Sequence, residues 1–153
     1  MASAEQPAIL VSACLLGVRC NHRGAASPSA AVAALADGAR LVPVCPESMG
    51  GLPTPRPAAE IQPGGRVVDE QGVDVTDAYE RGARATVELA RSTGAQAAVL
   101  KARSPSCGCH DVYDGRFQGT LRDGLGVTAQ ALVTAGLTVR SEEDVEAESE
   151  SRD

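Results

Sequence analysis

The chain has 153 residues and 43% of them are hydrophobic, which suits one domain with one buried core. Its net charge of −6 comes from the last 13 residues, which hold seven acidic residues and one Arg, while the remaining body has 13 acidic and 13 basic residues. This neutral body has only three aromatic residues and no apolar stretch near the roughly 20 residues of a membrane helix, which argues against nucleic-acid binding and against a membrane span.

The first third of the chain predicts a strand, a helix and a second strand. Residues Met1–Pro7 carry no basic residue and the apolar run that follows is too short for a signal peptide, so we expect a cytoplasmic protein. That continuous apolar run, Ala8–Ala13, is typical of a buried parallel strand. A helix is expected from Pro28 to Gly38, and Arg40–Val44 predicts the second strand.

The middle of the chain predicts a small hairpin, a long helix and a third strand. Two short strands with a Pro-Gly-Gly turn between them are expected within Glu60–Asp69. Thr76 suits the N-cap of a long helix that ends before Gly94, because the apolar positions between them follow helical spacing. The apolar segment Ala97–Lys101 predicts the third strand.

The last third predicts a hairpin, a helix and a fourth strand. The Asp-Gly pair in Tyr113–Phe117 indicates a tight hairpin, Gly126–Gly136 a helix and Leu137–Val139 a short strand. Helices between parallel strands predict an α/β fold, a single-domain, open, mostly parallel, Rossmann-like sheet with helices on both faces. We expect this domain over residues 1–140 and an acidic, disordered tail over residues 141–153.

Three of the five cysteines share one structural context. Cys14 directly follows the first predicted strand, Cys45 directly follows the second, and Cys107 lies in the loop after the third. The loops at the carboxyl ends of parallel strands meet at one crevice, so we expect these thiols to lie close together. A reducing cytosol makes a disulfide framework improbable, and clustered cytosolic cysteines favour metal binding or catalysis.

Three chemistries suit three converging thiolates. Iron–sulfur clusters prefer soft thiolate ligands, zinc can bind three cysteines with one open position, and a thiol redox relay needs no metal. The lack of a local Cys-x-x-Cys pair argues against structural zinc. His110, however, lies beside the Cys107-Gly-Cys109 segment and can complete a zinc site there.

Several long motifs of the chain resemble one family. The segments SACLLGVRCNHRG, VPVCPESMGGLPTPRP, LKARSPSCG and YDGRFQG, together with AEI, DVT and GVTA, resemble the thiouracil desulfurase family over about Ile9 to Asp144. The resemblance implies non-redox desulfuration of 2-thiouracil or a related thiolated nucleobase, with release of hydrosulfide and the oxo-base. It also implies a [4Fe-4S] cluster with three cysteine ligands and one open iron.

Site residues follow from this resemblance, position by position. The cluster ligands fall on Cys14 in SACLLG, on Cys45 in VCPES and on Cys107 in SPSCG. Glu47, two residues after Cys45, matches the acid/base, and Ser104 matches the active-site serine of the family. The implied partner is a small-molecule thiolated nucleobase.

The remaining candidates are weaker. Cys20 and Cys109 match no ligand position and are interpreted as spare thiols. Lys101, the only lysine, lies near the crevice and is a weak substrate-binding candidate, as is Ser106, while Asn21 and Arg56 have side chains that can hydrogen-bond a base. The alternative hypothesis is a non-enzymatic metal- or redox-sensing module that uses the same cysteines.

Overall fold

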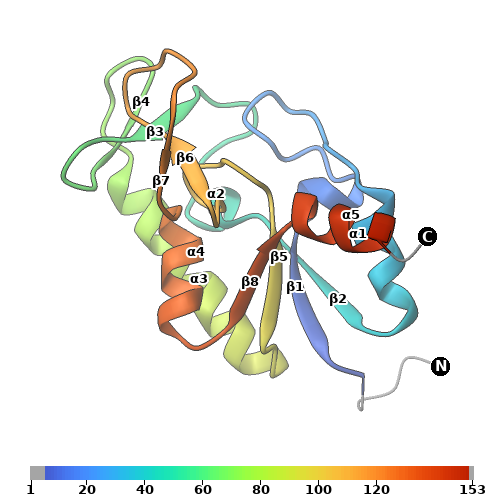
Figure 1. The fold of residues 1–153 in the computed structure, drawn as a ribbon. Helices are drawn as coiled ribbons and strands as arrows, with labels where there is room; N and C mark the ends of the chain where they lie inside the picture. Colours follow the sequence, from blue (N-terminus) through green and yellow to red (C-terminus); the bar gives the residue numbers. More distant parts are fainter. Residues whose placement is uncertain (1–5, 152–153) are drawn as a thin grey trace.

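A four-stranded parallel sheet forms the centre of the protein (Figure 1), which a computed structural model describes over residues 6–151. The strands lie in the order β2-β1-β5-β8. Their bounds are Ala8–Ser12 for β1, Arg40–Val44 for β2, Ala97–Leu100 for β5 and Thr138–Ser141 for β8. The α/β fold class and the mostly parallel sheet are therefore confirmed, with every strand within about two residues of its predicted bounds.

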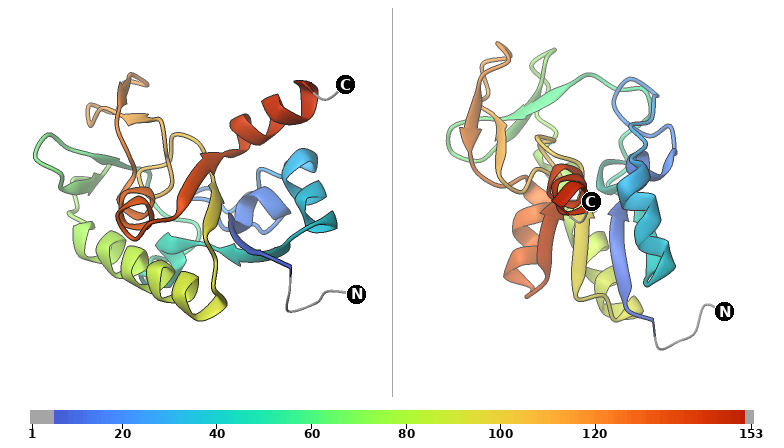
Figure 2. Two further views of the ribbon diagram at one scale, coloured as in Figure 1. Left: turned by 60° about the horizontal axis from the view of Figure 1, so that its bottom comes forward. Right: turned by 45° about the vertical axis from the view of Figure 1, so that its right-hand side comes forward.

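Helices cover both faces of this sheet (Figure 2). The helices α3 and α4 lie together on one face, and α1 and α5 lie together on the other. The helical segments are α1 at Ala30–Ala33, α2 at Pro46–Met49, α3 at Thr76–Thr93, α4 at Val127–Thr134 and α5 at Glu142–Ser151, with 3-10 turns at Ala13–Leu16 and Ala34–Asp37. No described helix is both long and apolar enough to cross a membrane.

Alternation along the strands divides the core into two layers. Leu10 and Leu100 face α3 and α4, where they pack with Leu132. Val11 and Val99 face α1 and α5. Because neighbouring strand residues point to opposite faces, a sheet buried on both sides needs an uninterrupted apolar run, and that run is what revealed these strands in the sequence.

Two helices begin differently from the prediction. The first starts after Ser29, not at Pro28, because the Ser29 hydroxyl accepts the Val32 N–H at 3.3 Å and caps the helix there. Thr76 is the first residue of α3 and not its N-cap. Its hydroxyl accepts the Val67 N–H at 2.9 Å, so it ties the helix to β4 and is not free to cap.

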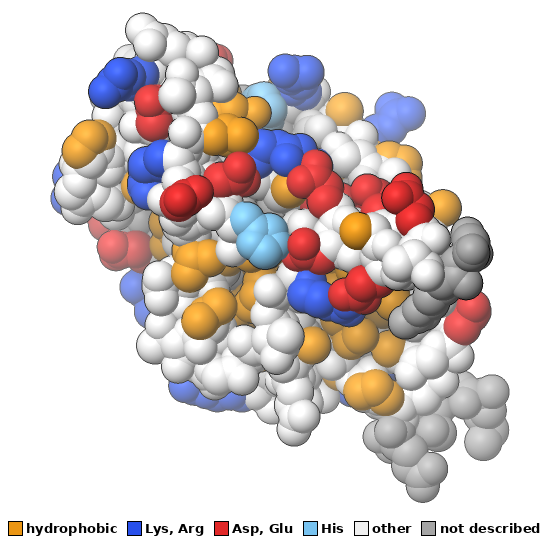
Figure 3. Space-filling model, in the orientation of Figure 1, with side chains coloured by type: hydrophobic (Ala, Val, Ile, Leu, Met, Phe, Trp, Pro, Cys, Tyr) orange, Lys and Arg blue, Asp and Glu red, His pale blue; other side chains and the backbone are white. Residues whose placement is uncertain are grey.

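The acidic C-terminal segment forms a helix where a disordered tail was expected. Residues 142–151 form α5, and Figure 3 shows acidic side chains gathered over this part of the surface. Two tertiary contacts explain the order: Val145 is buried in the core layer under α1, and Glu142 accepts hydrogen bonds from Lys101 and from the backbone of Ala102. Residues 152–153 of the expected tail lie outside the described part of the chain.

Two small hairpins stand above the carboxyl edge of the sheet (Figure 1). One pairs β3, Ala59–Ile61, with β4, Val67–Asp69, and the other pairs β6, Asp111–Tyr113, with β7, Leu121–Asp123. The second hairpin has a loop over residues 114–120, not the tight Asp-Gly turn that was predicted. Glu60 of β3 accepts the N–H groups of Gly115 and Phe117, at 2.9 and 3.1 Å, and so holds this loop open.

Candidate metal centre and active site

A cavity of about 610 Å³ lies at the carboxyl edge of the sheet. The chain leaves β1 toward β2 on one side and later returns to β5 on the other side, so the connections diverge at the ends of β1 and β5. Open α/β sheets bind their ligands at this kind of switch point. The floor of the cavity comes from the loops after β1, β2 and β5, and its upper wall comes from the two hairpins.

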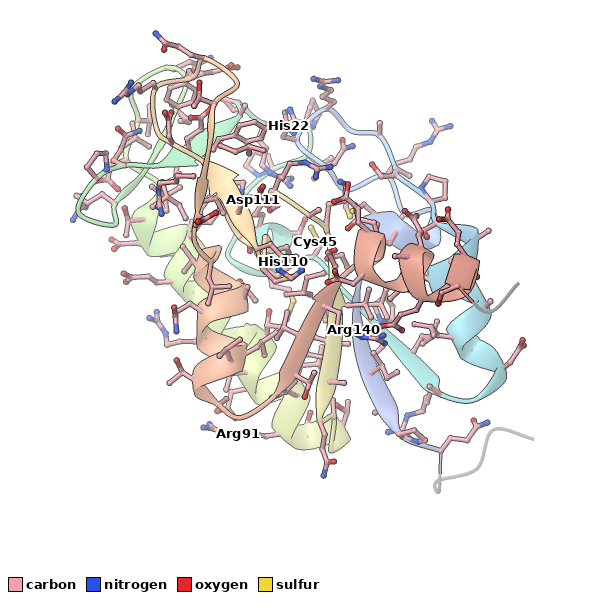
Figure 4. All side chains as sticks on the ribbon, in the orientation of Figure 1. His22, Cys45, Arg91, His110, Asp111 and Arg140 are labelled. Carbon is pink, nitrogen blue, oxygen red and sulfur yellow. The ribbon has the colours of Figure 1, made fainter. Side chains whose placement is uncertain are left out.

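The three predicted cysteines all line this cavity. Cys14 lies in the 3-10 turn after β1, Cys45 between β2 and α2, and Cys107 in the loop after β5. All three are free thiols. The structure therefore brings together residues that are up to 93 positions apart in the chain, as strand topology alone predicted. Figure 4 labels Cys45 at this edge of the sheet.

Burial keeps two of these thiols protonated when nothing is bound to them. It raises the pKa of Cys14 to about 11, against the opposing influence of the Lys101 ammonium. It raises the pKa of Cys107 to about 12, and the nearby Glu47 carboxylate adds to the effect. Metal ligation requires thiolates, so a cationic centre must supply the stabilisation that buried anionic sulfur lacks here.

The arrangement of the three thiols suits a cluster better than a single ion. Within residues 6–151, just one group of three potential ligand atoms lies within 4.8 Å of one another, and it does not include these cysteines. The sulfur atoms of Cys14, Cys45 and Cys107 therefore do not all lie within 4.8 Å of one another and are not arranged around a single ion in this structure. A cluster whose iron atoms each take a different thiolate fits this donor set, because iron–sulfur clusters are held by soft sulfur ligands.

Ser12 and Ser48 hold two of these sulfur atoms in place. The buried Ser12 hydroxyl donates to the Cys107 Sγ at 3.6 Å and accepts the Lys101 N–H at 2.9 Å, so it links the ends of β1 and β5. The Ser48 hydroxyl lies 3.2 Å from the Cys45 Sγ. Hydrogen bonds to ligand atoms are one of the ways in which a protein orients a metal centre.

Glu47 points into the same cavity and is held by two donors. The Tyr79 hydroxyl donates to its Oε2 at 3.0 Å, and the Arg56 Nε donates to the same oxygen at 3.1 Å. Burial, and then the Glu47 charge, raise the pKa of Tyr79 above its usual range, so the phenol stays a donor. Both bonds use Oε2, which leaves Oε1 for a substrate or a water.

Arg56 has a structural role, because most of its hydrogen-bond donors are used by protein groups and few are free for a nucleobase. Besides Glu47, its guanidinium donates to the carbonyl oxygens of Cys20 and Pro53 and to the Thr54 hydroxyl. Its side chain is only 5% exposed. The five N–H groups of a guanidinium are thus largely taken, and Arg56 joins the loop of Cys20 to the loop of Glu47.

Close packing of α2 against α3 positions Cys45 and Glu47. A side-chain carbon added at Gly82 would lie 1.9 Å from the Pro46 carbonyl oxygen, and one added at Gly50 would lie 1.9 Å from the Ala78 carbonyl oxygen. The two helix backbones touch at these glycines because neither has a side chain. This contact brings Tyr79 of α3 within reach of Glu47.

Ser104 lies on the cavity wall at the start of the loop that carries Cys107. Its hydroxyl oxygen accepts the backbone N–H groups of Ser106 and Cys107, both at 3.1 Å, in a local turn. These two bonds shape the loop and leave the hydroxyl proton to be donated into the cavity. The turn that Ser104 forms is therefore compatible with the active-site role predicted for it.

The two weak substrate candidates differ in their access to the cavity. Lys101 lines it, and its Nζ pairs with Glu142 Oε2 at 2.9 Å. Ser106 is fully buried outside the lining residues, with its hydroxyl 2.9 Å from that of Thr128. Substrate binding stays a prediction for both residues, and the geometry favours Lys101.

The two cysteines outside the predicted ligand set lie in different places. Cys20 lines the cavity, and burial together with the neighbouring Cys45 raises its pKa to about 12. Cys109 lies outside the lining residues, beside the core layer under α3 and α4. Cys20 is thus the spare thiol that is best placed to compete for a metal.

Sequence reasoning missed Tyr79 and Phe117 as site residues. Tyr79 has the spacing of a core position on α3, so the pattern gave no sign of its bond to Glu47. Phe117 lines the cavity from the β6–β7 loop with a φ of 56°, an unusual value for a bulky residue. The scarcity of aromatic residues, three in the whole chain, was the sequence signal that could have identified it.

Comparisons with known proteins agree on one family. A family model described as 2-thiouracil desulfurase matches residues 9–144. The solved structure of the [4Fe-4S]-dependent thiouracil desulfidase TudS is 42% identical, with a TM-score of 0.86, and the match covers 93% of this chain and 95% of that one. The uncharacterized protein YbbK of Bacillus subtilis (strain 168) is 40% identical over 146 residues, which is 90% of this chain and 97% of YbbK.

Proposed function

The chain belongs to the 2-thiouracil desulfurase family and is a [4Fe-4S]-dependent thiouracil desulfidase, and we propose that Cys14, Cys45 and Cys107 hold its cluster. The observation that carries this assignment is the meeting of three thiols, from the ends of three parallel strands, in one cavity that also contains Glu47. Family membership favours the enzyme over the alternative of a non-enzymatic sensing module.

The cluster supplies the chemistry that no side chain of the cavity offers. When bound, a cluster on three thiolates has one iron without a protein ligand, and this iron is a Lewis acid for a soft thiocarbonyl sulfur. The three cysteines hold that centre at the floor of the cavity. Ser12 and Ser48 keep the sulfurs of Cys107 and Cys45 oriented through their hydroxyl groups.

Glu47 is the proposed general base. Its free Oε1 accepts a proton from the water that attacks the carbon of the C–S bond, while Tyr79 and Arg56 hold Oε2. The water supplies the oxygen of the product, the C–S bond breaks and the sulfur leaves as hydrosulfide. No electron is transferred, so the reaction needs no nicotinamide or flavin.

The upper wall of the cavity suits a planar heterocycle. Phe117 and Tyr113 line it from the β6–β7 hairpin, and their rings offer flat apolar faces on which a pyrimidine can stack. Ser104 and Lys101 line it too and offer donors for the ring carbonyl and nitrogen atoms. Free 2-thiouracil is the substrate that these contacts support, since three of the four Lys and Arg side chains that line the cavity, Arg56, Lys101 and Arg103, are already paired with carboxylates and not free for a phosphate backbone.

One experiment tests the proposed function directly. Protein reconstituted with iron and sulfide under anaerobic conditions is incubated with 2-thiouracil, and uracil and hydrosulfide are quantified. We expect the two products in equal amounts from the cluster-loaded protein and none from the cluster-free protein. A loaded protein that forms no uracil would contradict the proposal for this substrate.

Replacing the proposed base separates its role from that of the cluster ligands. Glu47→Gln keeps the size and one carbonyl oxygen but cannot accept the proton, so we expect turnover to fall by about 10²- to 10⁴-fold with iron content unchanged. Iron and sulfide per chain are measured beside the rate of uracil formation. If Glu47→Gln retains most of the wild-type rate, another group is the base.

A further inference from the structure

A second group of metal-binding side chains lies outside the cavity. The ligand atoms of Cys109, His110 and Asp144 all lie within 4.8 Å of one another, and no other such triple occurs in the described residues. His110 Nε2 and Asp144 Oδ2 are 2.7 Å apart. None of the three residues lines the cavity, so this group is distinct from the cluster site.

The group joins two parts of the fold. Cys109 and His110 lie between the Cys107 loop and β6, while Asp144 lies in the first turn of α5. Figures 3 and 4 share one orientation, in which the labelled His110 lies on the front surface. The His110 side chain is 63% exposed and that of Asp144 is 34% exposed, so an ion can reach both from solvent.

Asp144 is oriented before any ion arrives. Its Oδ2 accepts the Ser141 N–H at 2.9 Å, and its own N–H donates to the Ser141 hydroxyl at 3.2 Å. These two bonds anchor the carboxylate to the end of β8 at the start of α5. Outer-shell hydrogen bonds of this kind commonly hold the ligands of metal sites in proteins.

The donor set identifies the class of cation. One thiolate, one imidazole and one carboxylate are the ligands that zinc takes in proteins, while magnesium and calcium prefer oxygen alone. The 2.7 Å between His110 Nε2 and Asp144 Oδ2 is a hydrogen-bond distance, and the two atoms need to separate only to about 3.3 Å to bind one tetrahedral ion at about 2 Å each. Three protein ligands leave the fourth tetrahedral position for water.

The surrounding charge favours a cation at this place. The carboxylates of Asp144, Glu142 and Asp111 all lie near the Cys109 side chain and make its surroundings acidic. A divalent ion would offset this negative charge. Lys101, the nearby cation, is already paired with Glu142.

We propose that Cys109, His110 and Asp144 bind a zinc-class divalent cation, which ties the loop that follows Cys107 to the first turn of α5. The site is independent of the cluster, since Cys109 matches no cluster ligand and all three residues lie outside the cavity.

The test uses cluster-loaded enzyme under anaerobic conditions. The protein is mixed with Zn²⁺ and passed through a desalting column, and zinc and iron per chain are measured. We expect one zinc per chain in addition to the cluster iron. The zinc X-ray absorption edge should show one sulfur ligand among nitrogen and oxygen ligands, and the melting temperature should rise with zinc.

Matched variants separate this site from nonspecific binding. His110→Ala and Asp144→Asn should weaken zinc binding by about 10- to 100-fold or more. His22→Ala, which removes the other histidine of the chain, and Glu143→Gln, beside Asp144, should retain the zinc. Unchanged cluster iron in every variant shows that the enzyme itself remains intact.

Three results would overturn the proposal. The first is wild-type protein that retains no zinc after desalting. The second is His110→Ala that binds zinc as tightly as the wild type does. The third is a zinc spectrum with several sulfur ligands and with loss of iron, because the zinc would then occupy the cysteines of the cavity.

Discussion

Tyr79 and Arg56 determine which oxygen of Glu47 is free to act. Both donate to Oε2, at 3.0 and 3.1 Å, and the carboxylate side chain is only 15% exposed. A lone glutamate in a loop is ordinarily solvated, and the sequence provides no reason to expect otherwise. Its two partners come from other segments, Arg56 from the Pro-rich loop and Tyr79 from α3, and together they convert a loop residue into an oriented one.

Tyr79→Phe tests this orientation. The variant loses one hydrogen bond to a charged group, a contribution of about 1.5–3 kcal/mol, so we expect kcat to fall by about 10-fold or more with KM nearly unchanged. Steady-state uracil formation by the cluster-loaded enzyme gives both constants. Tyr113→Phe is the matched control, since it removes the other phenol near the cavity without a bond to Glu47, and equal losses in the two variants would contradict the role given to Tyr79.

At the scale of elements, α2 is too short to be stable by itself and depends on α3. It has only four residues, Pro46–Met49, and isolated helices of that length do not form in water. The contact at Gly50 and Gly82 lets the two backbones touch, which places Cys45 and Glu47 at the cavity. The Pro-Gly-rich sequence here gave no prediction of regular structure, because the helix owes its existence to packing.

Gly82→Ala should disturb this contact. The added methyl group would lie 1.9 Å from the Pro46 carbonyl oxygen, so the helices must separate, and we expect the free energy of unfolding to fall by at least about 2 kcal/mol. Gly38→Ala is the control, since nothing lies within 4 Å of the added carbon there, and its effect should stay within about 0.5 kcal/mol. Urea unfolding of the cluster-free chains measures the free energy of unfolding of both variants. If Gly82→Ala is as stable as the wild type, the two helices can move apart at little cost, contrary to the role given to this contact.

An ion pair between Glu142 and Lys101 anchors the helix α5, together with the buried Val145. Glu142 is 7% exposed, and it accepts hydrogen bonds from Lys101 Nζ and from the Ala102 backbone. The acidic composition that predicted a disordered tail describes the outer side of this helix correctly. The composition could not reveal that Glu142, the first residue of the helix, pairs with Lys101, the only lysine in the chain.

Glu142→Gln should therefore lower the free energy of unfolding more than Glu143→Gln does. It leaves the Lys101 charge without its partner, and because that lysine side chain is 28% exposed we expect a loss of only about 1–2 kcal/mol. Glu143→Gln breaks the more exposed pair with Arg103 and should cost less than about 0.5 kcal/mol. Denaturant midpoints compare the two variants, and equal midpoints would argue against a structural role for the Lys101–Glu142 pair.

At the scale of the whole molecule, strand order brings the thiols together. The parallel order β2-β1-β5-β8 places the ends of β2, β1 and β5 side by side, and each end carries one cysteine of the cavity. Cys20 enters the same cavity from a loop and not from a strand end. Position in the fold therefore separates three proposed ligands from one neighbouring thiol.

Single replacements of the cavity cysteines test this separation. Cys14→Ala, Cys45→Ala and Cys107→Ala should each abolish stable cluster binding, because the loss of one thiolate leaves two ligands. Cys20→Ala should keep the iron and sulfide content of the wild type. Both contents are measured after anaerobic reconstitution and desalting. If Cys20→Ala loses its iron, Cys20 is a cluster ligand in place of one of the three proposed cysteines.

The sequence by itself determined the strands, the fold class and three of the four cysteines that line the cavity. Apolar runs such as Ala8–Ala13 are local signals, and parallel strands carry their carboxyl-end residues to one edge whatever the strand order. Resemblance to a family then added Glu47, Ser104 and the cluster, and the comparisons confirmed the family and the cofactor.

Only the tertiary structure decided the contacts between segments. The bond from Tyr79 to Glu47 spans 32 residues, and the bond from Lys101 to Glu142 spans 41. No periodicity or turn motif in the sequence predicts either bond, because each depends on how one element packs against another. For the same reason the acidic C-terminus folds as α5, and Asp144 lies beside His110 at the second candidate metal site.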